Sequence, residues 1–116
     1  MKRKKDSIYL RHILEGINDI EEYTKGISEN NFSKNKLVHD AVILQIGIIG
    51  EAVKHLSSDF RKLHKDVPWK KIAGMRDKVI HDYFEVDIDA VWLTVEKEIP
   101  KLKEKVKEIL NKGLVD

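Results

Sequence analysis

The sequence contains no cysteine, which excludes disulfide bridges, thiolate nucleophiles and zinc sites that depend on cysteine. It also has no apolar run that approaches the roughly 18 to 20 residues needed for a membrane span. The basic first residues lead into an amphipathic pattern and not into the apolar block of a signal peptide. We therefore expect a cytoplasmic protein.

Charge of one sign is not in large excess. The chain has 22 Lys and Arg against 20 Asp and Glu, and a net charge of +2 is too small to indicate nucleic-acid binding by itself. Hydrophobic residues make up 41% and charged residues 36%, as is typical of a folded protein. A length of 116 residues suits one domain with one core. We predict a single domain over residues 1–116, with MKRKK at 1–5 as a short flexible tail.

Apolar residues recur at three- and four-residue steps, and no stretch alternates as a strand does. We therefore predict an all-α fold, a small bundle of four or five helices without a sheet. Residues 28–35 are expected to form a polar connection, Asp87 to cap the fourth helix and Pro100 to lie in the opening turn of the fifth. The predicted helices span about residues 6–25, 36–65, 68–82, 88–99 and 100–112.

The second predicted helix is apolar on more than one face between Ala41 and Ala52. Such a helix is either central in the domain or has one face against a partner chain. Gly47 and Gly50 are costly inside a helix, so we expect a close backbone crossing there. Trp69 and Trp92 are interpreted as core anchors.

Polar residues interrupt the apolar stripe in the segment GMRDKVIHDYF, residues 74–84. Arg76 lies at the edge of an arc that contains Met75 and Tyr83, and a guanidinium beside a core must be paired or face a polar cavity. Either it extends to solvent or pairs with a buried acid, for which Glu51 is one candidate. Packing alone predicts that Tyr83 is half-buried with its hydroxyl in water.

Asp77 and His81 are four residues apart, so in a helix the carboxylate can orient the imidazole. A carboxylate-supported histidine together with a permanent cation suits metal-independent RNA cleavage, because the 2′-hydroxyl must lose a proton and the phosphorus centre gains charge. In an unbroken helix, however, Arg76 and His81 point about 140° apart. Either the helix loosens near His81, Arg76 reaches round, or a second chain completes the site.

The pattern R-x-x-x-x-H-x-Y, here Arg76, His81 and Tyr83, resembles the signature of the HEPN superfamily and in particular its HepT-like branch. The segments IGEAVKHLS from Ile49 and PWKKIAGMRDKVIHDYFEVD from Pro68 extend the resemblance over nearly the whole chain. It implies a HEPN-type helical bundle that forms a homodimer, with the two motifs facing each other across a composite cleft.

The resemblance further implies a toxin of a type VII-like toxin–antitoxin system, acting as a metal-independent endoribonuclease without a cofactor. Its implied partners are RNA and a cognate minimal nucleotidyltransferase, which silences the toxin by AMP transfer. On this basis Arg76 and His81 would be catalytic, Asp77 would assist, and Tyr83 would accept AMP.

Two other interpretations stay open. One is a non-catalytic nucleotide- or partner-binding HEPN module that acts with a nucleotidyltransferase. The other is a helical dimer whose polar patch is structural, in which case an acid of the same chain satisfies Arg76 and no cleft forms. The remaining histidines share no spacing typical of a metal site and are interpreted as surface or boundary residues: His12, His39, His55 and His64.

Overall fold

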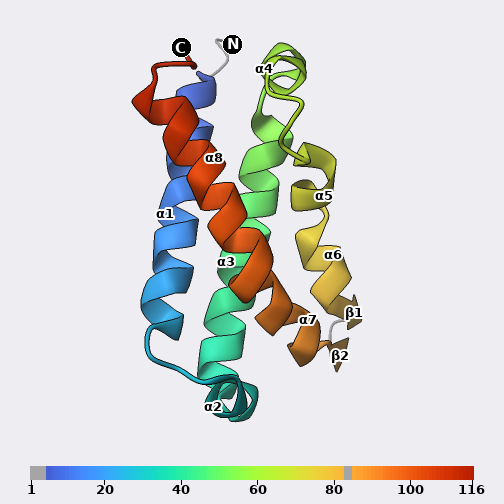
Figure 1. Ribbon diagram of the computed structural model, residues 1–116. Helices are drawn as coiled ribbons and strands as arrows, with labels where there is room; N and C mark the ends of the chain where they lie inside the picture. The colour runs from blue at the N-terminus through green and yellow to red at the C-terminus, as the bar shows by residue number, and fades with distance from the viewer. Residues whose placement is uncertain (1–4, 83–84) are drawn as a thin grey trace.

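The computed structural model describes residues 5–82 and 85–116, with only the backbone of His81 and Asp82. The predicted flexible tail therefore lies, apart from Lys5, outside the described residues. Within them the elements run in the order α1 (Asp6–Thr24), α2 (Glu29–Lys34), α3 (Lys36–His55), α4 (Ser58–Leu63), α5 (Trp69–Ala73), α6 (Met75–Val79), β1 (Ile80–Asp82), β2 (Glu85–Val86), α7 (Ile88–Leu93), the π-helical segment η1 (Thr94–Glu98) and α8 (Ile99–Asn111) (Figure 1).

Helices α1 and α3 form the centre of the bundle and run in opposite directions (Figure 1). Helix α8 lies across them, and α5 and α6 pack on the other side of α3. Gly16 brings α1 close to α3, since a Cβ there would lie 2.9 Å from Ile49 Cγ1. The all-α fold class is confirmed, and α3 is the central helix that its apolar character predicted.

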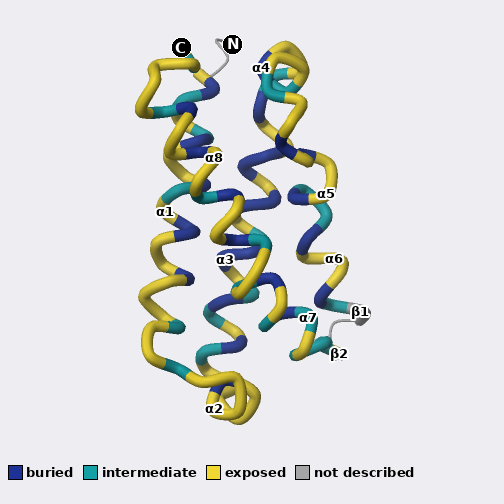
Figure 2. The backbone as a smooth tube through the Cα atoms, viewed as in Figure 1, coloured by how far each residue is buried: buried dark blue, intermediate teal, exposed yellow. Residues whose placement is uncertain are grey.

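The core follows the predicted periodicity. The α1 stripe of Leu10, Ile13, Ile17 and Ile20 is fully buried, and the buried positions of the bundle face one another in Figure 2. Burying one such side chain stabilises the fold by about 1.5–3 kcal/mol. No helix in the described part of the chain combines the length and apolar character needed to cross a membrane.

Two predicted boundaries are wrong because serine side chains start new helices. Ser28 Oγ accepts a hydrogen bond from Asn31 N at 3.2 Å, so part of the expected polar connection forms α2. Ser57 Oγ likewise accepts from Phe60 N at 3.1 Å and ends the long second helix by opening α4. Both Ser57 donors are held by the buried Asp6: Ser57 N donates to Oδ1 at 2.8 Å and Ser57 Oγ to Oδ2 at 2.7 Å.

The predicted third helix divides into α5 and α6 at Gly74 and ends at Val79. Gly50 permits the expected close crossing here, because a Cβ on it would lie 3.0 Å from Ala73 O. After Val79 the chain forms a two-stranded antiparallel ribbon, β1 with β2, in which Ile80 pairs with Val86. The prediction of a bundle without a sheet is therefore wrong at this short ribbon, because the chain becomes extended after Val79.

Asp87 caps α7 as predicted, with Oδ1 accepting a hydrogen bond from Ala90 N at 3.0 Å. Pro100 lies in the first turn of α8, also as predicted. The two helices are nevertheless joined through η1. Proline lacks an N–H donor and crowds the preceding turn, and a wider π-helical turn accommodates both effects. Trp69 is buried in the core, whereas Trp92 is half-buried against Phe32.

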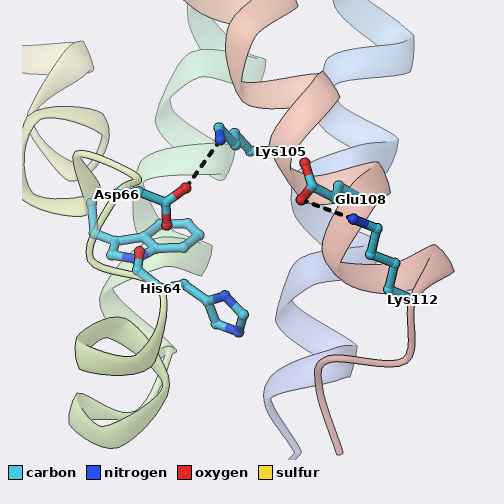
Figure 3. A network of polar contacts seen from close by, with 6 residues as sticks. His64, Asp66, Lys105, Glu108 and Lys112 are labelled. Atoms are coloured by element: carbon cyan, nitrogen blue, oxygen red, sulfur yellow. Dashed lines mark hydrogen bonds and ion pairs between the residues drawn. The ribbon is translucent and has the colours of Figure 1, made fainter.

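The connection between α4 and α5 is tied to α8 by polar contacts (Figure 3). Lys105 Nζ donates to Asp66 Oδ2 at 3.0 Å, and this hydrogen bond lowers the pKa of the Asp66 carboxyl below its ordinary value of 3.8. Trp69 Nε1 donates to His64 O at 3.0 Å. These contacts fix the start of the segment that leads to Arg76.

Candidate active site

Arg76 projects from α6 across the surface of α3. Its Cδ lies 3.4 Å from the place where a Cβ of Gly47 would be, so the glycine leaves room for the arginine stem. The Arg76 side chain is 57% exposed, and its Nη1 is 4.0 Å from Oδ1 of Asp77, which is 87% exposed. An ion pair this long between exposed groups is weak. The guanidinium therefore keeps its capacity to bind an anion.

Glu51 is not the buried partner that the sequence analysis considered for Arg76. It is exposed, and its Oε1 accepts a hydrogen bond from Lys54 Nζ at 3.2 Å. Arg76 also faces an open groove. The groove counts against the structural interpretation, which expected no cleft, whereas an acid of the same chain, Asp77, does lie 4.0 Å from Arg76.

The groove lies between α1, α3 and α6 and has a volume of about 810 Å³. We call it the Arg76 groove. Its wall combines charged, aromatic and apolar side chains, and Gly47 forms part of its floor beneath Arg76. The other lining residues are Tyr9, His12, Asp40, Ile43, Leu44, Ile48, Glu51, Ala52, Lys54, His55, Ala73, Asp77 and Ile80.

His81 does not continue the helix that carries Arg76. Helix α6 ends at Val79, Ile80 has the extended angles φ −115° and ψ 110°, and His81 lies in β1. Asp87 N donates to Val79 O at 2.8 Å, so the ribbon satisfies a carbonyl at the helix end. The predicted extension of the helix to His81 or Asp82 is therefore wrong.

Two geometric expectations change with that helix end. The angle of about 140° between Arg76 and His81 applied to an unbroken helix and does not hold here. The helical four-residue relation between Asp77 and His81 is lost for the same reason. The side chain of His81 and the whole of Tyr83 lie outside the described residues, so their predicted roles remain predictions.

Three ring side chains in the Arg76 groove were missed by the sequence analysis. Tyr9 stacks on His55 with ring centroids 5.2 Å apart and planes 13° apart, and it meets His12 edge-on at 6.3 Å. No local sequence signal marks this cluster, because its residues are brought together by the pairing of α1 with α3. His39 also differs from its interpretation as a surface or boundary residue, since it is buried and its Nε2 contacts Phe32 O.

A second hollow, of about 470 Å³, lies over α4, α5 and the connection between them. Among the residues that the structure describes, no acidic one lines it, although the chain has nearly balanced charge. We call it the basic hollow, after its five cationic lining residues: Arg61, Lys62, Lys65, Lys70 and Lys71. Helix α5 contributes to both hollows, which places this positive surface beside the Arg76 groove.

A metal centre has no evident ligand set in the part of the chain that the structure describes: no three His, Cys, Asp or Glu side chains there are grouped to hold an ion. The side chain of His81 is not among the described residues, so this statement does not cover it.

Comparison with known proteins gives a family. Residues 13–109 match the family model described as "Ribonuclease HepT-like". "Putative RNase TTE0752" of Caldanaerobacter subterraneus is 51% identical over 104 residues, covering 90% of this chain and 93% of that protein. "Probable ribonuclease HepT" of Thermococcus cleftensis is 46% identical over 101 residues, covering 87% and 92%.

A third relative is longer. "Gamma-glutamylcyclotransferase and putative RNase MJ0434" of Methanocaldococcus jannaschii is 51% identical over 108 residues, which cover 93% of this chain but 49% of that protein. The chain thus spans about half the length of this relative. No solved structure gave a match. The extent of the family match and the identity to full-length relatives show that the chain belongs to the ribonuclease HepT-like family.

Proposed function

We propose that the protein is a metal-independent endoribonuclease that cleaves RNA by attack of a 2′-hydroxyl on the adjacent phosphorus. The observation that carries the proposal is Arg76, an exposed guanidinium in an open groove whose one ion pair among the described residues is a 4.0 Å contact to an exposed acid. A cation held in this way can bind a phosphodiester and stabilise charge that develops on it. Membership in the ribonuclease HepT-like family supports the same activity.

The proposed reaction uses two residues of the motif. His81 takes the proton of the 2′-hydroxyl, the 2′-oxygen bonds to phosphorus, and the bond from phosphorus to the 5′-oxygen breaks. The 5′-oxygen takes up a proton, so the products are a 2′,3′-cyclic phosphate and a 5′-hydroxyl. Arg76 stabilises the phosphorane, and Asp77 takes the assisting role that the family resemblance implies.

The basic hollow supplies positive charge for the remainder of the strand. Single-stranded nucleic acid binds largely through cations that follow its backbone. The hollow shares α5 with the Arg76 groove, so these cations are near enough in the fold to contact a strand that leaves the groove along α5. This local surface explains how a chain of net charge +2 can bind RNA.

We further propose a homodimer in which Arg76 of one copy acts with His81 of the partner subunit. The support is an apolar stripe on α3 that no described residue covers: Leu37 is 81% exposed, Leu44 61% and Ile48 41%. Steps of seven and four residues place the three on one helix face. Leu44 and Ile48 also line the Arg76 groove, so a copy docked on the stripe would close the groove into a cleft.

As a regulatory step, we propose that a minimal nucleotidyltransferase encoded with this protein neutralises it, as the antitoxin of a type VII-like pair. The Tyr83 oxygen would bond to the α-phosphorus of a nucleoside triphosphate, with release of pyrophosphate and the phenolic proton. An AMP group two residues from His81 adds bulk and negative charge where RNA phosphate must bind. Mass spectrometry after incubation with that enzyme and ATP should locate AMP on Tyr83 and find none on Tyr83→Phe.

Cleavage is tested with labelled RNA in excess EDTA, using protein whose intact mass shows no added AMP. We expect the wild type to leave 2′,3′-cyclic phosphate ends. Arg76→Ala and His81→Ala should each slow cleavage by about 10²–10⁴-fold. Arg11→Ala, an exposed arginine of α1 outside the Arg76 groove, is the matched control and should cut normally. An inert, unmodified wild type would instead favour the nucleotide- or partner-binding module.

The composite cleft is tested by mixing two inactive proteins. When Arg76→Ala and His81→Ala are unfolded together and refolded, half of the dimers contain one of each, and each such dimer has one of its two sites intact. Activity should return to roughly a quarter of the wild-type value. No recovery would place both residues of a site in one chain.

The dimer itself is tested by sedimentation. Leu44→Lys should yield monomers, whereas Leu63→Lys, at a 74% exposed leucine of α4, should not.

A further inference from the structure

The Arg76 groove has a second end that the proposed reaction does not use. There Tyr9 and His12 of α1 and His55 of α3 bring three aromatic rings together. We propose that this ring cluster is a nucleobase-binding subsite, which stacks an unpaired base of the RNA whose backbone is held at Arg76. The proposal rests on the proposed function for the identity of the strand, but the base recognition itself does not require cleavage.

The first argument is the placement of the rings. His12 and His55 are exposed and Tyr9 is half-buried, and all three line the groove. Tyr9 also packs against the core, but the fully buried side chains of α1 and α3 are aliphatic ones such as Ile13 and Ile49. The rings are therefore additional aromatic surface at the edge of the core, facing a space of about 810 Å³.

The second argument is the shape of the cluster. Tyr9 and His55 are nearly parallel, with a 13° angle between their planes, and His12 stands at 88° to Tyr9. This arrangement offers a stacked face and a perpendicular edge to a planar ligand, and imidazole nitrogens can hydrogen-bond the edge of a base. Every base has a π-face, so such a platform binds single strands with little dependence on sequence.

The third argument is the register along α3. Gly47, Glu51 and His55 follow at four-residue steps and all line the groove. Eight residues of helix span about 12 Å, and Arg76 lies over Gly47. The ring cluster thus lies at one end of the α3 wall and the cation near its middle, a separation that suits a base at the end of the groove and a phosphate of the same strand further along it.

The test uses a ligand that cannot be cut. A short 2′-O-methyl oligonucleotide lacks the attacking hydroxyl, and a strand of the same length with every base removed keeps its sugars and phosphates. We expect the wild type to bind the intact strand about 5- to 150-fold more tightly than the abasic strand in fluorescence anisotropy, the range that stacking of one base gives. Equal affinity of the wild type for the two strands overturns the proposal without any variant.

Variants test whether the preference for the intact strand over the abasic strand depends on the ring cluster. Tyr9→Leu and His55→Ala should bring the ratio of the two affinities close to one, while Tyr9→Phe, which keeps the ring, should retain it. Tyr23→Leu is the matched control, because Tyr23 lies on the same helix outside the groove and should leave the ratio unchanged. A ratio that survives both Tyr9→Leu and His55→Ala places base recognition elsewhere and refutes the subsite.

The two proposals fail separately. RNA cleavage without a base preference leaves the ribonuclease intact and removes the subsite. A base preference that depends on Tyr9 and His55, found in a protein that does not cut RNA, supports the subsite and removes the ribonuclease.

Discussion

Alanine at Gly50 and alanine at Gly47 should have opposite effects on stability, although both replace a glycine inside α3. Either change gains about 0.5–1 kcal/mol of helix propensity. At residue 47 the new Cβ meets Arg76 Cδ at 3.4 Å, an ordinary contact. At residue 50 it lies 3.0 Å from the backbone oxygen of Ala73, so α5 must move away from α3. Overpacking of this kind costs about 1–3 kcal/mol.

The free energy of unfolding should therefore rise by up to about 1 kcal/mol in Gly47→Ala and fall by up to about 2 kcal/mol in Gly50→Ala. Urea unfolding followed by circular dichroism measures both, at equal protein concentration because a dimer is stabilised by concentration. The two midpoints should differ by roughly 1 M urea at an unchanged slope. Equal stabilisation of the two variants would refute the close crossing at Gly50.

Three further predictions concern polar contacts that hold the bundle together and the charge of the basic hollow. Lys105→Gln should raise the pKa of Asp66 toward 3.8. Because that pKa is lowered in the folded wild type, the wild type should be more stable than the variant above about pH 4 and should lose this advantage as pH falls through the folded pKa. Urea unfolding at several pH values measures the difference. Asp6→Ala removes the acceptor of both Ser57 donors and should cost about 1–3 kcal/mol in the same assay. Lys65→Gln should lower the slope of log affinity against log salt for single-stranded RNA by about 0.7, and an unchanged slope would exclude Lys65 from phosphate binding.

The bundle could be predicted because its signals are local. The buried stripe of α1, the Asp87 cap and the close approach at Gly50 each follow from a short stretch of sequence, and each is present in the structure. The break at Ser57 could not be foreseen in this way. It depends on hydrogen bonds from Ser57 to Asp6, 51 residues away, which favour a new helix over continuation of the old one.

The candidate site likewise contains residues that local sequence could identify and residues that it could not. Arg76 was identified from its neighbours in the sequence, and the structure places it in a groove. The ring pair of Tyr9 and His55 was not identified, because the two residues lie on separate helices and neither has a marked sequence context. The end of α6 was not predicted for a further reason. The backbone oxygen of Val79 accepts a hydrogen bond from Asp87 N across the ribbon, and the spacing of apolar residues carries no information about such a bond.

The early end of α6 has a consequence for how this motif tolerates change. Inside a helix, one inserted residue turns everything that follows by about 100° and moves it along the axis. Between Arg76 and His81 the helix has already ended, so an added or lost residue after Val79 would alter the length of an extended connection and leave the arginine in its groove. The spacing of the two motif residues is thus set partly by a ribbon, in which a one-residue change would turn the His81 position to the other face of the strand but would not rotate Arg76 out of its groove.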